Sequence, residues 1–298
     1  MVVFAHQAII ARGALASEPQ YVPSRPDSLA YMNEPTDSDE VREMPRQHAE
    51  RGPFPLMGDE GADHLYFRQL LSGRDFAIND PVASQMMNFS YLVGDSQTRA
   101  AVIVDPAYCV EDLLAVLAAD SMTLAGVLAT HHHPDHVGGS IFGISIEGVL
   151  RLVELQDVPI HVNRDELTWV ARSTGIAQSQ LVSHDSGDTL SLGAVEIEFL
   201  HTPGHTPGSQ CFLVRKRLLA GDTLFLQGCG RTDLPGGDPA ALYDSLTKRL
   251  ARVPDDTLLF PGHHYSHDAV ASMGATRSEN YVLRPAAFEE WMAAFGTS

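Results

Sequence analysis

Four of the fourteen histidines fall within the six consecutive positions 131 to 136, and one carboxylate, Asp135, lies among them. An apolar run from Leu124 to Ala129 precedes this cluster, and the pair Gly138-Gly139 follows it. Neutral imidazoles and carboxylates are ligands for zinc, and also for iron and manganese. A tract of solvated histidines, such as a tag, is the alternative, but a tag would be terminal and would lack the ordered strand. The cluster therefore predicts a metal site at the end of a buried strand.

Three further polar turns each follow an apolar strand, as the histidine cluster does. They contain His205, Asp222 and His263. Because parallel-type sheets gather ligands at their strand ends, we expect the four turns to share one rim. Together they supply enough ligands for two metal ions. The first ion would take His131, His133 and His205, the second would take Asp135, His136 and His263, and the Asp222 carboxylate would bridge the two.

The elements that position these turns alternate between strands and helices from about His64 onward. Strands are expected at residues 88–95, 100–104, 124–130, 158–162, 195–200, 211–214, 218–220 and 257–260, and helices at residues 110–119, 164–172, 239–250 and 285–295. This repeating strand-helix-strand order predicts a layered α/β architecture. The segment from 141 to 155 mixes helical and loop features, and its structure stays open.

Residues 1–61 differ from the rest of the chain. Seven of the eighteen prolines lie between Pro19 and Pro55, mixed with polar residues, and neither helical nor strand periodicity is present. Such a segment cannot bury enough apolar surface to form a core of its own. We therefore expect a Pro-rich N-terminal arm or linker at residues 1–61 and a folded domain at residues 62–298.

The overall composition is 44% hydrophobic and 19% charged, which allows a sizeable buried core. A net charge of −18 argues against nucleic acid or an anionic membrane as a partner, and no run approaches the ~18 apolar residues of a membrane span. The three cysteines form no CxxC pair, so we expect no disulfide framework and a cytoplasmic location. A small-molecule substrate is the expected partner, and a homo-oligomer is compatible with the sequence.

The chain resembles the metallo-β-lactamase superfamily from about Asn88 to Leu283. The family motif THxHxDHxGG is present as THHHPDHVGG at residues 130–139, and the later Gly-His, Gly-Asp and Gly-His pairs follow in the family's order, ending at His263. This resemblance implies a four-layer αββα sandwich with metals in a groove at one edge of the two sheets. It also makes residues 62–298 the catalytic domain.

Within that superfamily, the closest likeness is to the glyoxalase II-like (hydroxyacylglutathione hydrolase-like) enzymes, through residues 88–93, 103–106 and 230–238. Asp222 fits this branch, because true β-lactamases place Cys at the bridging position. The likeness implies a hydrolase with two divalent cations, for which zinc is expected and iron or manganese is also suited. The substrate would be a thioester or a related ester or lactone. Only residues 264–298 follow His263, too few for the helical domain that holds glutathione in full-length glyoxalase II, which counts against a glutathione thioester itself.

The expected mechanism uses a hydroxide shared by the two cations. Two cations lower the pKa of a shared water from near 15.7 toward ~7, and one of them polarises the carbonyl that the hydroxide attacks. Asp135 would bind metal and orient this water, which makes it the expected catalytic residue. Arg231 is a candidate for binding a substrate carboxylate, with an ion pair to Asp233 as the alternative. Tyr265 would donate to the substrate or pack beside the site, and His132 is expected to point away from the metals.

A second likeness is to the persulfide dioxygenases, which use the same fold around one iron. Residues 67–70 and 229–233 carry it, and it implies an iron held by His131, His205 and Asp222. Two segments depart from that family's usual pattern: Val137-Gly138-Gly139 replaces Ile-Thr-Gly, and the residues after GRTD are Leu-Pro rather than Phe-Gln. A non-catalytic metal-binding module of the same fold is a third hypothesis, and the complete ligand set counts against it. The hydrolase is the preferred hypothesis.

Overall fold

The computed structural model describes residues 64–141, 143–284 and 287–295. The Pro-rich arm expected at residues 1–61 lies outside the described residues, so its division from the folded domain stays a prediction. Among the described residues, no helix is long and apolar enough to cross a membrane.

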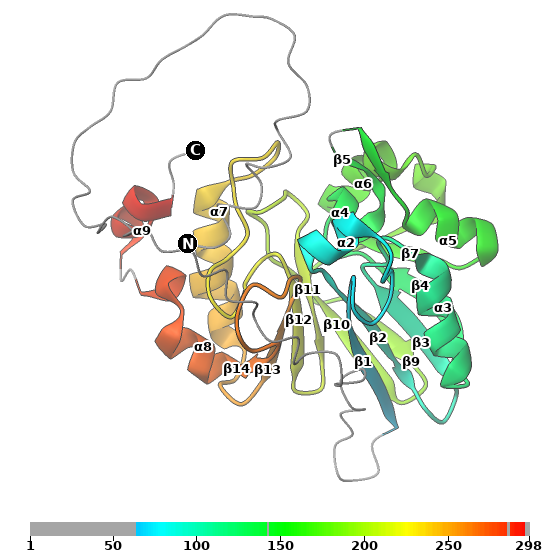
Figure 1. Cartoon of the computed structure of the whole chain (residues 1–298). Helices are drawn as coiled ribbons and strands as arrows, with labels where there is room; N and C mark the ends of the chain where they lie inside the picture. The colour runs from blue at the N-terminus through cyan, green and yellow to red at the C-terminus, as the bar shows by residue number, and fades with distance from the viewer. Residues whose placement is uncertain (1–63, 142, 285–286, 296–298) are drawn as a thin grey trace, which may run out of the picture. The chain divides into compact units, whose positions relative to one another are not determined.

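Two mixed six-stranded sheets form the centre of the described chain (Figure 1). In the first sheet the strands lie in the order β1 (Leu65–Leu71), β2 (Phe89–Asp95), β3 (Ala100–Val104), β4 (Thr123–Leu128), β7 (Ile160–Asn163) and β8 (Leu181–His184). In the second sheet the order is β14 (Ala271–Ser272), β13 (Leu258–Pro261), β12 (Arg217–Gly221), β11 (Gln210–Val214), β10 (Val195–His201) and β9 (Thr189–Leu192).

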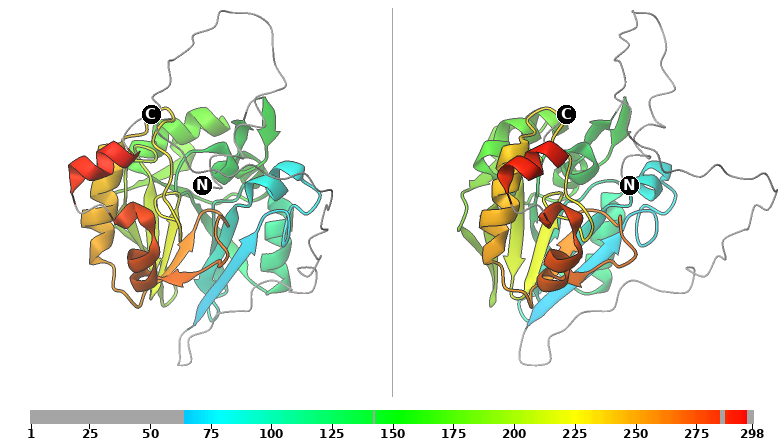
Figure 2. Two further views of the ribbon diagram at one scale, coloured as in Figure 1. Left: turned by 60° about the vertical axis from the view of Figure 1, so that its left-hand side comes forward. Right: turned by 90° about the vertical axis from the view of Figure 1, so that its left-hand side faces the viewer.

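Helices cover the outer face of each sheet (Figure 2). The first sheet packs against α3 (Val110–Ala119), α5 (Val149–Leu155) and α6 (Leu167–Thr174). The second sheet packs against α7 (Pro239–Asp244), α8 (Met273–Glu279) and α9 (Phe288–Phe295). Two further short α-helices of the described chain are α2 (Pro81–Met86) and α4 (Pro134–Val137).

Three hydrophobic cores separate the four layers. One lies between the first sheet and its helices, and another lies between the second sheet and its helices. The third joins the inner faces of the two sheets, where Phe67, Phe199, Phe212 and Phe260 are almost fully buried. Aromatic side chains of this size contribute most of the apolar area in such a core. The expected αββα sandwich is therefore confirmed.

The sheets are mixed rather than parallel throughout. Strands β3, β4, β7 and β8 run parallel, as do β12 and β13, whereas β10, β11 and β12 form an antiparallel meander. The open segment from 141 to 155 contains the end of the small hairpin β5 (Gly139–Ile141) and β6 (Ile144–Ile146), followed by α5. The helix expected at 239–250 starts as predicted, with Asp238 capping Ala240 N and Ala241 N, and continues past α7 as a wider helical turn at Ser245–Arg249.

The strand ends at one edge of the sandwich are tied together by backbone hydrogen bonds. Gln210 N in the second sheet donates to Thr130 O after β4, at 3.0 Å. Gly262 N donates to Gly221 O at 2.8 Å, and Asn88 forms an isolated antiparallel bridge with His263. These bonds hold the four polar turns at a common rim.

Candidate metal centre

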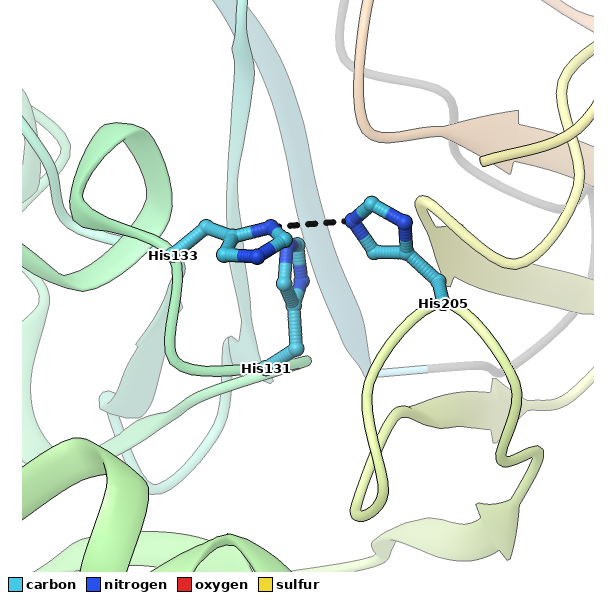
Figure 3. A group of neighbouring side chains, drawn as sticks. All are labelled: His131, His133 and His205. Atoms are coloured by element: carbon cyan, nitrogen blue, oxygen red, sulfur yellow. Dashed lines mark hydrogen bonds between the residues drawn. The ribbon is translucent and has the colours of Figure 1, made fainter. Parts of the chain in front are cut away.

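Three imidazoles from two separate turns meet at the rim (Figure 3). His131 and His133 leave the loop after β4, and His205 lies in the turn between β10 and β11. The Nδ1 atom of His133 lies 3.0 Å from Nε2 of His131 and 3.0 Å from Nε2 of His205. All three nitrogens could ligate a single ion.

The hydrogen bonds made by Nδ1 of His131 and of His205 show that the other ring nitrogen, Nε2, faces the centre of this group. Thr130 Oγ1 donates to Asp105 Oδ2 at 2.7 Å, and it therefore accepts from Nδ1 of His131 at 3.0 Å. Nδ1 of His205 donates to the backbone oxygen of Arg231 at 2.6 Å. Both Nε2 atoms thus present lone pairs to His133, the arrangement that a cation stabilises.

The second group consists of Asp135, His136 and His263, all buried. Their ligand atoms are Asp135 Oδ2 and the two Nε2 atoms, which lie 3.3 to 3.5 Å apart. Nδ1 of His136 donates to Asp105 Oδ2 at 2.9 Å, and Nδ1 of His263 donates to Met86 O at 2.8 Å. Their Nε2 lone pairs therefore also converge.

Asp222 lies between the two groups, at the end of β12. Its Oδ2 lies 3.6 Å from Nε2 of His205 in the first group and 3.3 Å from Nε2 of His263 in the second. Its Oδ1 is buried and has no hydrogen-bond partner among the described residues. An orphaned carboxylate oxygen among imidazole lone pairs is what a cation would satisfy. The residues present therefore fit two divalent cations bridged by Asp222.

The electrostatics of both carboxylates and of His131 agree with this fit, whereas the carboxylates of Asp222 and Asp135 outweigh burial and raise the pKa values of His136 and His263. Burial alone would raise the pKa of Asp135 and of Asp222, but the neighbouring imidazoles lower both pKa values well below the ordinary range. Burial and the adjacent imidazoles of His136 and His133 hold the pKa of His131 well below its usual value. The carboxylates are thus ionised and His131 is neutral near pH 7, which are the protonation states that bind cations.

Two buried carboxylates fix the turns that carry these ligands. Asp105 accepts from Thr130 N, from Thr130 Oγ1 and from His136 Nδ1. Glu166, only 1% exposed, accepts from His132 N and Thr206 Oγ1 through Oε1, and from Gly208 N through Oε2. Glu166 therefore ties the loop of His131 and His133 to the turn of His205.

The structure brings all seven expected ligands together and places His132, Arg231 and Tyr265 outside the ligand set. His132 points away, with Nδ1 2.6 Å from Glu166 Oε1 and its ring stacked on Trp169. The guanidinium of Arg231 pairs with Asp233, which is the alternative expected for it. Tyr265 stacks on His263 with ring centroids 4.6 Å apart, and burial raises the pKa of its hydroxyl to about 12.

Sequence reasoning missed three residues of this site: Asn88, Asp105 and Glu166. Asn88 is 3% exposed, and its amide nitrogen lies 3.1 Å from Asp135 Oδ2. Asn88 and Asp105 belong to the segments 88–93 and 103–106, which indicated the glyoxalase II likeness without a role for either side chain. Glu166 has no local signal, because its partners lie 34 to 42 residues away.

Comparison with known proteins finds relatives that include hydroxyacylglutathione hydrolases and persulfide dioxygenases. The chain is 34% identical over 206 residues to a hydroxyacylglutathione hydrolase of Synechococcus sp., covering 66% of this chain and 72% of that protein. It is also 34% identical over 197 residues to the human mitochondrial persulfide dioxygenase ETHE1, covering 64% and 70%. The crystal structure of ETHE1 from Myxococcus xanthus matches 78% of this chain and 90% of that chain, with 31% identity and a TM-score of 0.64.

The family itself is defined by a match over most of the domain. Residues 84–263 match the family model described as the metallo-beta-lactamase superfamily, and this range contains every one of the seven ligands described above. The two sheets, the helices on their outer faces and the metal-binding rim all agree with that match. The chain belongs to the metallo-beta-lactamase superfamily.

Proposed function

We propose that this chain is a metal-dependent hydrolase that binds two divalent cations and cleaves a thioester or a related ester or lactone. The observation that carries the proposal is the complete second ligand group. Asp135, His136 and His263 converge within 3.5 Å of one another, beside a bridging carboxylate, Asp222, that has an unsatisfied oxygen. A site with one cation at His131, His205 and Asp222 would leave these three buried residues without a metal to bind.

Two divalent cations at this site would supply Lewis acidity for a carbonyl and would lower the pKa of a shared water. The chain's own residues prepare the site for that chemistry. Thr130, Asp105 and Met86 O fix the imidazole tautomers, so that the ligand lone pairs face inward without further rearrangement. The Asp135 carboxylate, kept ionised by its neighbours, would bind metal and could accept a hydrogen bond that orients a water toward the substrate.

The thioester class is supported by the 34% identity to a hydroxyacylglutathione hydrolase. The experiment is a hydrolysis assay of the zinc-, manganese- and iron-loaded chain against a hydroxyacylglutathione, a simple acyl thioester and a lactone. We expect hydrolysis of a thioester or lactone, and loss of activity in His131→Ala, His205→Ala and Asp222→Ala. Full activity in any one of these variants would contradict the site assignment.

A persulfide dioxygenase is the second candidate, because a 34% identical relative carries that name and a 31% identical solved structure carries the name ETHE1. This reaction would use one iron at His131, His205 and Asp222. The variant His263→Ala discriminates between the two, because it removes a ligand of the second cation alone. It should strongly reduce hydrolysis but leave much of an iron-dependent consumption of oxygen with a persulfide substrate.

The matched control is His184→Ala, in which a histidine away from the ligand set is truncated. His184 stacks on Phe199, with ring centroids 4.1 Å apart. This variant should retain the wild-type reaction, whichever that is. Oxygen consumption with a persulfide by the iron-loaded wild type, without hydrolysis by any metal form, would overturn the hydrolase proposal.

A further inference from the structure

The loop 222–231, which follows β12, begins and ends at the metal centre. Its first residue, Asp222, is the bridging carboxylate, and at its end Arg231 O accepts from Nδ1 of His205 at 2.6 Å. The backbone of Gly230 lies so close to this imidazole that a side-chain carbon there would be 2.8 Å from His205 Cγ. The end of the loop therefore decides whether Nδ1 of His205 keeps its partner, and with it which ring nitrogen faces the cation.

One side chain outside the ligand set holds the middle of this loop. Asn280 is fully buried, and its amide nitrogen donates to Phe225 O at 2.9 Å and to Gly228 O at 3.0 Å. Its amide oxygen accepts from Gly228 N at 2.9 Å and from Val282 N at 3.1 Å. Both donors and both lone pairs of the amide are thus used, and this pattern fixes the orientation of the amide.

Most of this contact is made with Gly228. Its N–H and its carbonyl both pair with Asn280, and its φ of +103° lies in the left-handed region that favours glycine. A side-chain carbon at this position would lie 3.1 Å from the hydroxyl of Tyr281. Since only Cys229 lies between Gly228 and Gly230, a shift at Gly228 reaches the backbone that lies against the imidazole.

Apolar packing also anchors the loop, but it constrains the backbone differently. Leu224, Leu226 and Cys229 pack into the core between the second sheet and its helices. Such packing is non-directional, whereas hydrogen bonds weaken steeply when their geometry changes. The amide of Asn280 therefore determines where the main chain at Gly228 lies within the space that the apolar side chains allow.

We propose that Asn280 is a positioning residue of the metal centre. It holds the loop so that Arg231 O stays on Nδ1 of His205 and the Nε2 lone pair stays directed at the cation. The inference goes beyond the proposed hydrolase, because His205 is a ligand in the two-cation site and in the one-iron alternative alike. It also gives the segment that follows α8 a part in the metal site.

The test observes the proton on Nδ1 of His205 by NMR, in metal-free protein with ¹⁵N-labelled histidine. In wild type this proton is bonded to Arg231 O and should exchange slowly with water. In Asn280→Asp the side chain cannot donate to both carbonyls of the loop. The end of the loop should then open more readily, so that the proton exchanges about tenfold faster.

The second ligand group provides an internal reference in the same spectra. Nδ1 of His136 donates to Asp105, and Nδ1 of His263 donates to Met86 O, so neither proton depends on the loop. Both should exchange as in wild type. A merely structural role of Asn280 would lower the melting temperature without this selective change at His205.

Metal affinity is the second readout of the same variant. A competitive titration of Zn²⁺ against a chromophoric chelator should show about tenfold weaker binding at the three-imidazole site, because an imidazole ligand loses its hydrogen-bond partner. Trp291→Phe is the matched control, since it removes the buried bond from Trp291 Nε1 to Val282 O but leaves the amide of Asn280 in place. It should lower the melting temperature and leave the His205 proton and the Zn²⁺ affinity unchanged.

Gly228→Ala perturbs the same contact from the loop and decides the question if Asn280→Asp does not fold. It should also speed exchange at His205 alone. An unchanged His205 proton in folded Asn280→Asp, or in Gly228→Ala, would overturn the assignment of Asn280. Equally faster exchange at His205, His136 and His263 would overturn it as well, because the change would then be a general loosening of the fold.

Discussion

The carboxylate of Asp105 provides a sharp test of how the second group of ligands is prepared. Its Oδ1 accepts from Thr130 N at 2.8 Å, and its Oδ2 accepts from His136 Nδ1 at 2.9 Å. In Asp105→Asn the remaining oxygen must stay on Thr130 N, because a backbone N–H can only donate. The new NH₂ group would then face Nδ1 of His136 and compete with its proton.

The expected loss of affinity for the second ion follows from this conflict at His136. Either the hydrogen bond to His136 is lost, or the imidazole moves its proton to Nε2, the atom that must bind the cation. A hydrogen bond to a charged group contributes about 1.5–3 kcal/mol, and loss of such a partner typically weakens a metal site 10- to 100-fold. We therefore expect the second ion to bind ~30-fold more weakly, which corresponds to about 2 kcal/mol.

The assay is a competitive titration of Zn²⁺ between the protein and a chromophoric chelator, with circular dichroism to verify the fold. Asp120→Asn is the matched control, because Asp120 pairs with Arg68 and Tyr66 and is outside the ligand set. It should leave both affinities unchanged. A second-ion affinity in Asp105→Asn within threefold of wild type would refute the role of Asp105 in fixing the His136 tautomer.

Three further predictions follow from named contacts. Glu166→Gln should weaken binding of the first ion about tenfold, because the hydrogen bonds from Thr206 Oγ1 and Gly208 N in the His205 turn lose a charged acceptor. The same chelator titration measures this affinity. Prolonged chelation should lower the melting temperature in calorimetry, since ions that bind only the folded chain stabilise it. Burial and His184 lower the pKa of His161 to about 4, below the usual 6.5. The unfolded chain therefore binds this proton before the folded chain does, so the stability present above pH 6.5 is lost as the pH falls toward 4. Between pH 7 and 4.5, the free energy of unfolding measured in urea should fall by ~2 kcal/mol more in wild type than in His161→Asn. An equal fall in the two proteins would contradict this prediction.

The ligands and most strands could be predicted because their signals are local. Each ligand follows an apolar strand within a few residues, and His131, His133 and Asp135 also share one short motif. Helix caps such as Asp238 before α7 are equally local, since the side chain accepts hydrogen bonds from backbone N–H groups two and three residues ahead.

The parts that could not be predicted depend on distant contacts. Asn88 reaches His263 across 175 residues, and nothing near residue 88 shows that its amide faces three ligands. Strand direction within the sheets is also a tertiary property, so the parallel-type rim expected from the alternation of elements appears as two mixed sheets. The wider turn at Ser245–Arg249 follows a regular helical pattern that gives no sign of it.

The central claim is that this rim holds two cations, and metal counting tests it most directly. Wild type and His263→Ala would be loaded with metal, freed of excess ions and analysed by mass spectrometry for zinc, iron and manganese. We predict two ions per chain in wild type and one in His263→Ala, with the three-imidazole site still filled. One ion per chain in both proteins would contradict it.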